Sequence, residues 1–235
     1  MDGGDDEGNY QMKVMGLDIS TKETGVCIAQ CGEKRSTKHS IVVSGTIRLR
    51  GIIPGTRVGR KSQRWEDLHP FARIITMSER VDAYINQYEP NFCVVEGYAF
   101  QSPKRTYLPF VAECTALCKH VMWHTNMPYI IVSPSQLKKF ATGRGNCKKD
   151  EVVDFANLLI DADSKCFFDN DNEADAVMLA AFGICLYGGN WISRKGKPKK
   201  WPQYAQQSTS GYKFDPSNGS TAGGSMKEFK ELIRT

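Results

Sequence analysis

The order of the apolar segments along this chain is the feature that most restricts its fold. Three segments with a strand-like pattern come first, at residues 10–20, 25–31 and 38–50. Helical and strand-like segments then alternate: helices are expected at 65–90, 105–126, 134–143, 148–160 and 173–189, and strands at 91–100 and 127–133. Consecutive strands form an antiparallel meander, whereas strands separated by helices pair in parallel. The order therefore predicts an α/β domain with a mixed five-stranded sheet and helices on both faces.

The domain organisation follows from length and local composition. A chain of 235 residues is long enough for one α/β domain, which we place at residues 12–190. Residues 1–11 are acidic and are expected to be a disordered lead-in, unlike the basic start of a secretory or transit peptide. Residues 191–235 are rich in Gly, Ser, Pro, Lys and Gln and are expected to form a basic flexible tail. No apolar run reaches the roughly eighteen residues of a membrane span, so an intracellular, soluble protein is expected.

Positive charge is concentrated in three parts of the chain, although the formal net charge is only +5. Residues 48–64 contain no acid, and residues 51–64 are expected to be a mobile basic loop; the cations of 48–64 are Arg48, Arg50, Arg57, Arg60, Lys61 and Arg64. A second group surrounds residues 138–149, with Lys138, Lys139, Arg144, Lys148 and Lys149, and a third lies at residues 194–200. Each cluster alone could be ordinary solvated surface. Together they suit a partner that carries phosphates, such as a nucleic acid.

Eight cysteines lie mostly inside apolar segments and are expected to be reduced and buried. Cys114, Cys118, His120 and His124 lie within eleven residues and are of the types that bind zinc. On one helix the two cysteines share one face and the two histidines another, so the four cannot bind a single ion.

Three acidic residues stand where strands end or a helix begins. Asp18 ends the first strand, Glu96 ends the fourth, and Asp175 lies near the start of the last helix. Sites assemble at the carboxyl ends of parallel strands, and carboxylates in apolar surroundings are costly unless they bind a cation. Their convergence would call for a hard divalent ion, Mg²⁺ or Mn²⁺, with Asn172 on the same helix face as Asp175. The alternative is a turn contact for Asp18, a surface pair for Glu96, and a helix cap at residues 171–173.

Four segments carry a resemblance to a known family: "MGLDISTKETGVCIA", "CVVEGYAF", "SPSQLKKFATGRGNCKKDEV" and "DNEADAVMLAA". In this order and spacing they resemble the signature segments of the RuvC-type Holliday junction resolvases, which belong to the RNase H-like and retroviral-integrase superfamily. The resemblance spans residues 13–187. It implies an RNase H-like fold and a metal-dependent endonuclease that acts as a homodimer. Such an enzyme nicks two opposed strands of a four-way DNA junction and leaves 5′-phosphate and 3′-hydroxyl ends.

The resemblance also implies roles for individual residues. The catalytic acids of the family correspond to Asp18, Glu96 and Asp175, which would hold two Mg²⁺ or Mn²⁺ ions. Asn172 stands where bacterial members have Asp or His, so either its amide or Asp171 would complete the metal site. The basic residues near the scissile phosphate correspond to Lys138 and Lys149, and the base-unstacking aromatic corresponds to Tyr98 or Phe100. The other expected DNA contacts are Lys139, Arg144, Lys148, Lys104, Arg105, Arg57, Arg60 and Lys61.

The basic segments 51–64 and 194–201 are longer than in the bacterial core, which favours a viral or phage-type member located in the host cytoplasm. The apolar segment 105–124 is the expected dimer interface.

Three alternative hypotheses about the function stay open. The first segment also resembles the phosphate segment of sugar kinases and actin-like ATPases, although no second such segment follows. The second is a junction-binding protein that does not cut, because Asn172 brings no charge to the metal site. The third is a nuclease that acts on flaps, forks or RNA–DNA hybrids.

Overall fold

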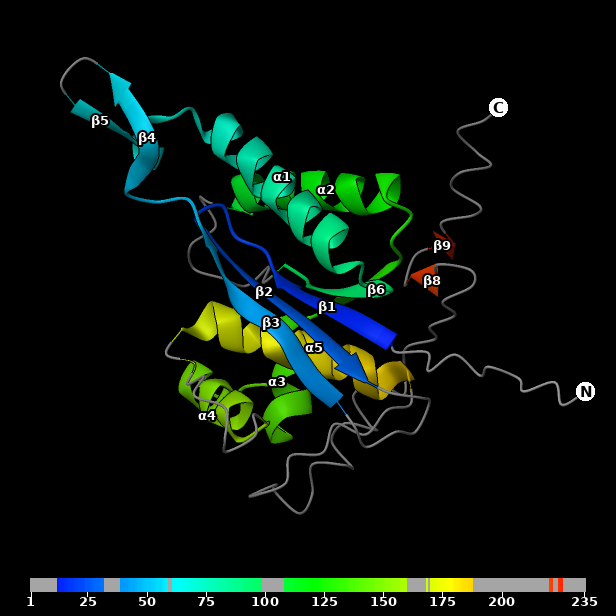
Figure 1. The fold of residues 1–235 in the computed structure, drawn as a ribbon. Coiled ribbons are helices and arrows are strands. Elements are labelled where there is room, and N and C mark those ends of the chain that lie inside the picture. The colour runs from blue at the N-terminus through cyan, green and yellow to red at the C-terminus, as the bar shows by residue number, and fades with distance from the viewer. Residues whose placement is uncertain are drawn as a thin grey trace, which may run out of the picture.

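A computed structural model of the chain describes residues 12–31, 39–58, 61–98, 108–159, 168, 170–187, 220–221 and 224–225. Its centre is a five-stranded sheet of order β3-β2-β1-β6-β7 (Figure 1). The strands are β1 (Met12–Asp18), β2 (Glu23–Cys31), β3 (His39–Arg48), β6 (Phe92–Glu96) and β7 (Tyr129–Val132). The first three pair antiparallel, and β6 and β7 run parallel to β1. The predicted mixed sheet is therefore confirmed.

Helices cover both faces of this sheet, as Figure 1 shows. One layer contains α1 (Pro70–Tyr88) and α2 (Leu108–His124), and the other contains α3 (Pro134–Thr142), α4 (Lys149–Leu159) and α5 (Asp171–Tyr187). Side chains of β1 alternate between the two cores: Val14 packs with the α5 layer, whereas Met15 and Leu17 pack with the α1 and α2 layer. Because both faces are covered, the strand reads as a nearly continuous apolar run.

The helix expected from residue 65 begins later than its pattern suggests. Residues Trp65–Asp67 form a short 3-10 turn, and α1 starts at Pro70 with the His69 side chain accepting a hydrogen bond from the Phe71 N–H. Proline is accommodated in the first turn of a helix because the N–H that it lacks has no intrahelical acceptor there. Pro70 is therefore the first residue of the helix, not a break inside it.

The expectation of a mobile loop at residues 51–64 is wrong. Within this range, β4 (Ile52–Val58) and β5 (Lys61–Arg64) form a two-stranded antiparallel ribbon, which stands away from both helical layers (Figure 1). The "KSQR" sequence of β5 is polar throughout and exposed in three of its four positions. Backbone pairing holds such a ribbon together, so hydrophobic periodicity gives no signal for it.

Of the two expected terminal segments, the structure describes only two short stretches, both near the C-terminus. Ser220–Thr221 (β8) and Gly224–Ser225 (β9) form a small antiparallel pair within the expected tail. Residues 1–11 and the remainder of 191–235 lie outside the described residues. Within the described part of the chain, no helix is long and apolar enough to cross a membrane.

Two glycines let α5 lie directly against the sheet. A Cβ atom on Gly16 of β1 would stand 2.0 Å from the Ala176 carbonyl oxygen, and one on Gly25 of β2 would stand 1.9 Å from the Asn172 carbonyl oxygen. These distances are far below van der Waals contact with backbone that cannot move aside. The first two turns of α5, which carry Asp175, are therefore held at the end of β1.

Replacing Gly16 with alanine should lower the free energy of unfolding by about 3 kcal/mol, because α5 would have to move off β1. Urea denaturation would measure the change. Gly45→Ala is the matched control, since Gly45 lies in β3 and a Cβ there would meet nothing within 4 Å. We expect the control to be neutral or slightly stabilising. Equal losses in the two variants would contradict the close approach of α5.

Candidate active site

Three carboxylates meet at one edge of the sheet. Asp18, Glu96 and Asp175 each offer an oxygen, and these three oxygens lie within 4.8 Å of one another. The sheet explains the meeting of the first two: Leu17 of β1 pairs with Val95 of β6, so the next residue of each strand emerges at the same point. The third comes from α5, which the glycine contacts hold against β1. The structure thus brings together the three acids that the sequence places at strand ends and a helix start.

Burial and mutual repulsion make these acids unusually hard to ionise. Burial is the main cause that raises the pKa of Asp18, and a hydrogen bond with Glu96 opposes it. Burial, followed by the charge of Asp18, raises the pKa of Glu96 well above its usual value. Burial and the Asp18 charge also raise the pKa of Asp175 to about 7. Close carboxylates cannot all be charged without a compensating cation, so this cluster must hold protons or a cation.

The donor set suits a hard divalent cation. Its ligand atoms are carboxylate oxygens, which Mg²⁺, Mn²⁺ and Ca²⁺ prefer over nitrogen or sulfur. Among the described residues, this is the one group of His, Cys, Asp or Glu side chains with metal-binding geometry. The acidic triad could therefore hold a divalent metal ion. The raised pKa values mean that such an ion would displace protons on binding.

Lys149 stands at the margin of the triad. As the first residue of α4, it donates a hydrogen bond from Nζ to the Asp171 carboxylate at 2.5 Å. Partial burial on its own lowers the pKa of Lys149, but the bond to Asp171 and the charges of Asp171, Asp175 and Asp18 raise it overall. The same hydrogen bond is the main reason why the pKa of Asp171 is lowered. A positive charge is thus held next to the three acids.

The Asn172 side chain has a structural role. Its side-chain Nδ2 donates to the Glu23 carbonyl of β2 at 3.2 Å, which ties the first turn of α5 to the sheet. The amide nitrogen is therefore occupied, and the oxygen Oδ1 is the atom that remains for a cation.

Sequence reasoning missed the residues that fasten the start of α5 to β3. Asn170 accepts a hydrogen bond from the Asn172 N–H at 2.9 Å and donates one to Thr46 Oγ1 at 2.8 Å. Glu173 accepts a hydrogen bond from Ser44 Oγ at 2.7 Å. The signal for Asn170 was present, since asparagine before an acidic first turn is a preferred N-cap. Its bond to β3 has no local signature.

The other expected DNA contacts have varied surroundings. Lys138 is half-buried, and its charge reaches the triad, where it lowers the pKa of Asp175 against the larger effects that raise it. Lys139 and Lys148 are exposed, whereas Arg144 forms an ion pair with Glu151. Arg57 and Lys61 are exposed on the β4–β5 ribbon. The remaining candidates lie outside the described residues: Arg60, Phe100, Lys104 and Arg105.

The aromatic candidate Tyr98 packs against α2. Its hydroxyl donates to the Ala112 carbonyl at 3.4 Å, and Lys119 Nζ lies 5.8 Å from the centre of its ring. The ring is therefore held on the protein surface.

The cysteines of the described residues are free thiols, and all but Cys185 are buried, as expected. Cys114 and Cys118 are residues of α2 whose side chains lie in the hydrophobic core. The rings of His120 and His124 instead pack on each other with centroids 4.3 Å apart. The two cysteines and the two histidines therefore lie in different surroundings of the helix.

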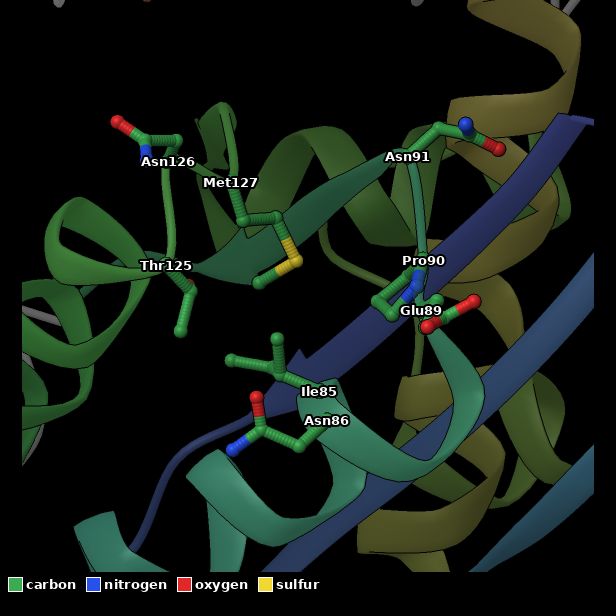
Figure 2. A pocket seen from close by; sticks show the side chains of 8 residues that line it. All are labelled: Ile85, Asn86, Glu89, Pro90, Asn91, Thr125, Asn126 and Met127. Atoms are coloured by element: carbon green, nitrogen blue, oxygen red, sulfur yellow. The ribbon is translucent and has the colours of Figure 1, made fainter.

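A pocket of about 250 Å³ lies away from the triad (Figure 2). Its lining comes from the end of α1 and from the segments that precede β6 and β7, so it opens at the amino ends of these strands, whereas Glu96 lies at the carboxyl end of β6. Figure 2 shows Ile85 and Met127 facing each other across it, while Asn126 points away. None of the expected site residues lines this pocket.

Sheet order, helical layers and the acidic triad together define an RNase H-like domain of the nuclease type. The family model "Crossover junction endodeoxyribonuclease RuvC" matches residues 14–183, and the chain belongs to this family. A family member from Hydrogenovibrio crunogenus is 25% identical over 141 residues, which cover 60% of this chain and 70% of that protein. One from Rickettsia bellii is 25% identical over 180 residues, which cover 77% of this chain and all of that protein.

Solved structures agree on the fold. RuvC from Thermus thermophilus in complex with a Holliday junction substrate superposes with a TM-score of 0.55 at 17% identity, covering 72% of this chain and 90% of that chain. A second structure of Thermus thermophilus RuvC gives a TM-score of 0.52 at 16% identity, with the same coverage. The RNase H-like fold expected from the four segments is confirmed.

Proposed function

We propose that this protein is a metal-dependent endonuclease that resolves four-way DNA junctions by paired nicks in opposed strands. The observation that carries the proposal is the convergence of Asp18, Glu96 and Asp175 at one sheet edge, in a chain of the RuvC family. The named relatives are crossover junction endodeoxyribonucleases, and the Thermus thermophilus RuvC structure contains a Holliday junction substrate. Hydrolysis would leave a 5′-phosphate and a 3′-hydroxyl end.

In this proposal the three acids would hold two ions, Mg²⁺ or Mn²⁺. Bound ions would supply Lewis-acid chemistry and an activated water for in-line attack on the phosphodiester. The Asn172 oxygen would be the neutral ligand of this site, while its nitrogen stays bound to the Glu23 carbonyl. Asp171 is the charged alternative, which would require it to release Lys149.

The remaining residues would bind and orient the DNA. Lys149, next to the triad, would stabilise the extra negative charge on the phosphate in the transition state. Phe100 is our candidate for unstacking bases at the junction centre, because Tyr98 is packed on α2. Phosphate contacts are assigned to Lys138, Lys139, Arg144, Lys148, Lys104 and Arg105.

A homodimer is part of the proposal, because paired nicks in two strands need two active sites. The outer faces of α1 and α2 expose large apolar side chains, which suit such a contact: Phe71 is 50% exposed, Ile75 37% and Phe110 40%.

Incubation of the purified protein with a labelled immobile four-way junction tests the proposal. Reactions with and without Mg²⁺ or Mn²⁺ should be compared with matched fork, flap and duplex substrates. Symmetric, metal-dependent nicks in opposed strands are the expected result. Tight binding without nicks in either metal would show a junction-binding protein instead, and preferred cutting of flaps or forks would change the substrate.

Replacing Lys149 with alanine should reduce the rate of cleavage by about a hundredfold and leave the dissociation constant for the junction nearly unchanged. The reason is that its charge lies beside the triad, where it acts on the transition state. Single-turnover cleavage and equilibrium binding would be measured separately. Lys148→Ala is the contrasting variant: it removes a proposed phosphate contact at the exposed neighbouring residue, so it should weaken binding but leave the cleavage rate of the bound junction unchanged. If Lys149→Ala weakened binding as much as cleavage, Lys149 would be only a phosphate contact.

A further inference from the structure

The β4–β5 ribbon starts from the same edge of the sheet as the acidic triad. In the pairing of β1 with β2, Asp18 lies opposite Gly25, and in the pairing of β2 with β3, Glu23 lies opposite Arg48. The end of β3 is therefore beside the triad edge, and β4 begins four residues later at Ile52. A ligand bound at the triad would lie within reach of the ribbon.

The foot of the ribbon is fastened to the domain on both strands. Leu49 is fully buried, and its N–H donates to the Lys22 carbonyl at 2.7 Å. On the other strand, Trp65 is buried and its N–H donates to the Gly51 carbonyl at 2.9 Å. The Gly51 N–H in turn donates to the Glu66 carboxylate at 2.9 Å. Such a base gives the ribbon a defined direction from the sheet.

The exposed surface of the ribbon is basic. Residues 51–64 contain no acid, and Arg57, Lys61 and Arg64 are exposed. Arg64 is paired with Glu66 at the foot, while in the described part of the chain neither Arg57 nor Lys61 has an acidic partner. Arg57 lies opposite Ser62 and Lys61 lies opposite Val58, so these two cations project from opposite faces of the ribbon. This charge is complementary to a polyanion that surrounds the ribbon.

The dimensions of the ribbon select one kind of groove. Two strands about 4.8 Å apart, with their exposed edges, make a body of about 10 Å. The major groove of B-form DNA is about 12 Å wide and admits a two-stranded ribbon, whereas the minor groove, about 6 Å wide, does not. The ribbon is a separate two-stranded sheet, so its outer backbone edges do not pair with other described strands. Those edges can donate N–H groups to phosphates on both groove walls.

We propose that the β4–β5 ribbon enters the major groove of a DNA duplex arm next to the branch point, with Arg57 and Lys61 as its main contacts. The inference rests on the proposed function, because it takes branched DNA as the ligand of the triad edge. A register shift between Ile52 and Arg57, where Gly55 has a φ of +75°, bends the ribbon partway along its length. Seven residues of β4 reach at most about 23 Å, so the contact lies within about six base pairs of the scissile phosphate.

Methylation protection by dimethyl sulfate tests the inference, because this reagent modifies guanine N7 in the major groove and adenine N3 in the minor groove. Wild-type protein bound to a four-way junction in EDTA, which prevents cutting, should protect guanine N7 positions within about six base pairs of the branch point. R57A/K61A should lose this protection and leave adenine N3 reactivity as in the wild type. Its affinity should fall about tenfold at moderate salt, and its slope of log K against log salt should decrease by about 2.

Two controls test whether the effect comes from the charge of the ribbon and from the shape of the groove. Ser62→Ala changes an exposed ribbon residue without changing charge and should keep both protection and slope. A junction with A-form RNA arms has a major groove too deep and narrow for the ribbon, so R57A/K61A should bind it as the wild type does.

The inference would be overturned by a double variant that keeps guanine N7 protection and the wild-type salt slope while the wild type still binds and cuts the junction. Protection of adenine N3 by the ribbon would overturn it as well. In both cases the proposed nuclease function would stand. A wild-type protein that neither bound nor cut junctions would instead refute the proposed function itself.

Discussion

Replacing Asp18 with asparagine should reduce metal-dependent cleavage of a four-way junction by about a thousandfold or more and leave junction binding intact. Asparagine keeps the size of the side chain but removes the charge that a divalent cation needs at the end of β1. Asp175→Asn and Glu96→Gln should behave in the same way, because the three carboxylate oxygens lie within 4.8 Å of one another and act as one site. Single-turnover cleavage and equilibrium binding with Mg²⁺ and with Mn²⁺ are the measurements.

Asp150→Asn is the matched control for these variants. Asp150 is an exposed acid in the first turn of α4 and is not part of the triad. We expect the control to cut the junction at the wild-type rate. If Asp18→Asn failed to fold, the acid would have a structural role, and if it still cut normally, the site would lie elsewhere.

The second large effect concerns stability: Asp175→Asn should make the metal-free protein more stable at pH 8, by about 2 to 4 kcal/mol. Burial and the charge of Asp18 raise the pKa of Asp175 from the usual 3.8 to about 7 in the folded protein. A group with a raised pKa in the folded state contributes stability that is complete below about pH 4 and is lost as the pH rises through about 7. The upper limit follows because each tenfold change in proton affinity is worth about 1.4 kcal/mol.

Thermal or urea unfolding in EDTA at pH 5 and pH 8 would measure this effect. At pH 5 Asp175 is protonated in the folded protein but largely ionised in the unfolded chain, so the variant should be more stable than the wild type by only about 1 to 2 kcal/mol, less than at pH 8. At pH 8 the variant should be more stable, and Mg²⁺ or Mn²⁺ should stabilise the wild type much more than the variant. Asp150→Asn serves again as the control. A variant less stable than the wild type at pH 8 without metal would show that Asp175 is not a strained carboxylate.

The three acids lower the stability of the metal-free protein but provide the ligands for a catalytic cation. Metal-free protein keeps three acids at a partly buried edge, where burial raises the pKa of each and the charge of Asp18 raises those of Glu96 and Asp175 further. A cation removes that cost when it binds. The acids are therefore an unfavourable arrangement for folding alone, and a cation site explains why the chain carries them.

Much of the site was accessible from local sequence. Asp18 and Glu96 each end a strand and were expected to converge if those strands are neighbours, which the sheet order confirms. Asp175 was placed with them because an acid inside an apolar helix needs a partner. Asn170 could have been found as an N-cap. Its bond to Thr46, the bond of Asn172 to Glu23, and the pair of Lys149 with Asp171 join residues far apart in the chain. Such long-range hydrogen bonds leave no periodic or motif signal.

Apolar periodicity and helix-ending residues are local properties of the chain, so they were enough to predict the order of strands and helices and the mixed sheet. They also placed a carboxylate at each of the two strand ends. The tertiary structure alone decided how close α5 lies to Gly16 and Gly25, since that distance depends on a helix and two strands remote in sequence. It likewise decided that residues 51–64 form a ribbon, because backbone pairing between polar strands is independent of the hydrophobic pattern from which strands are predicted.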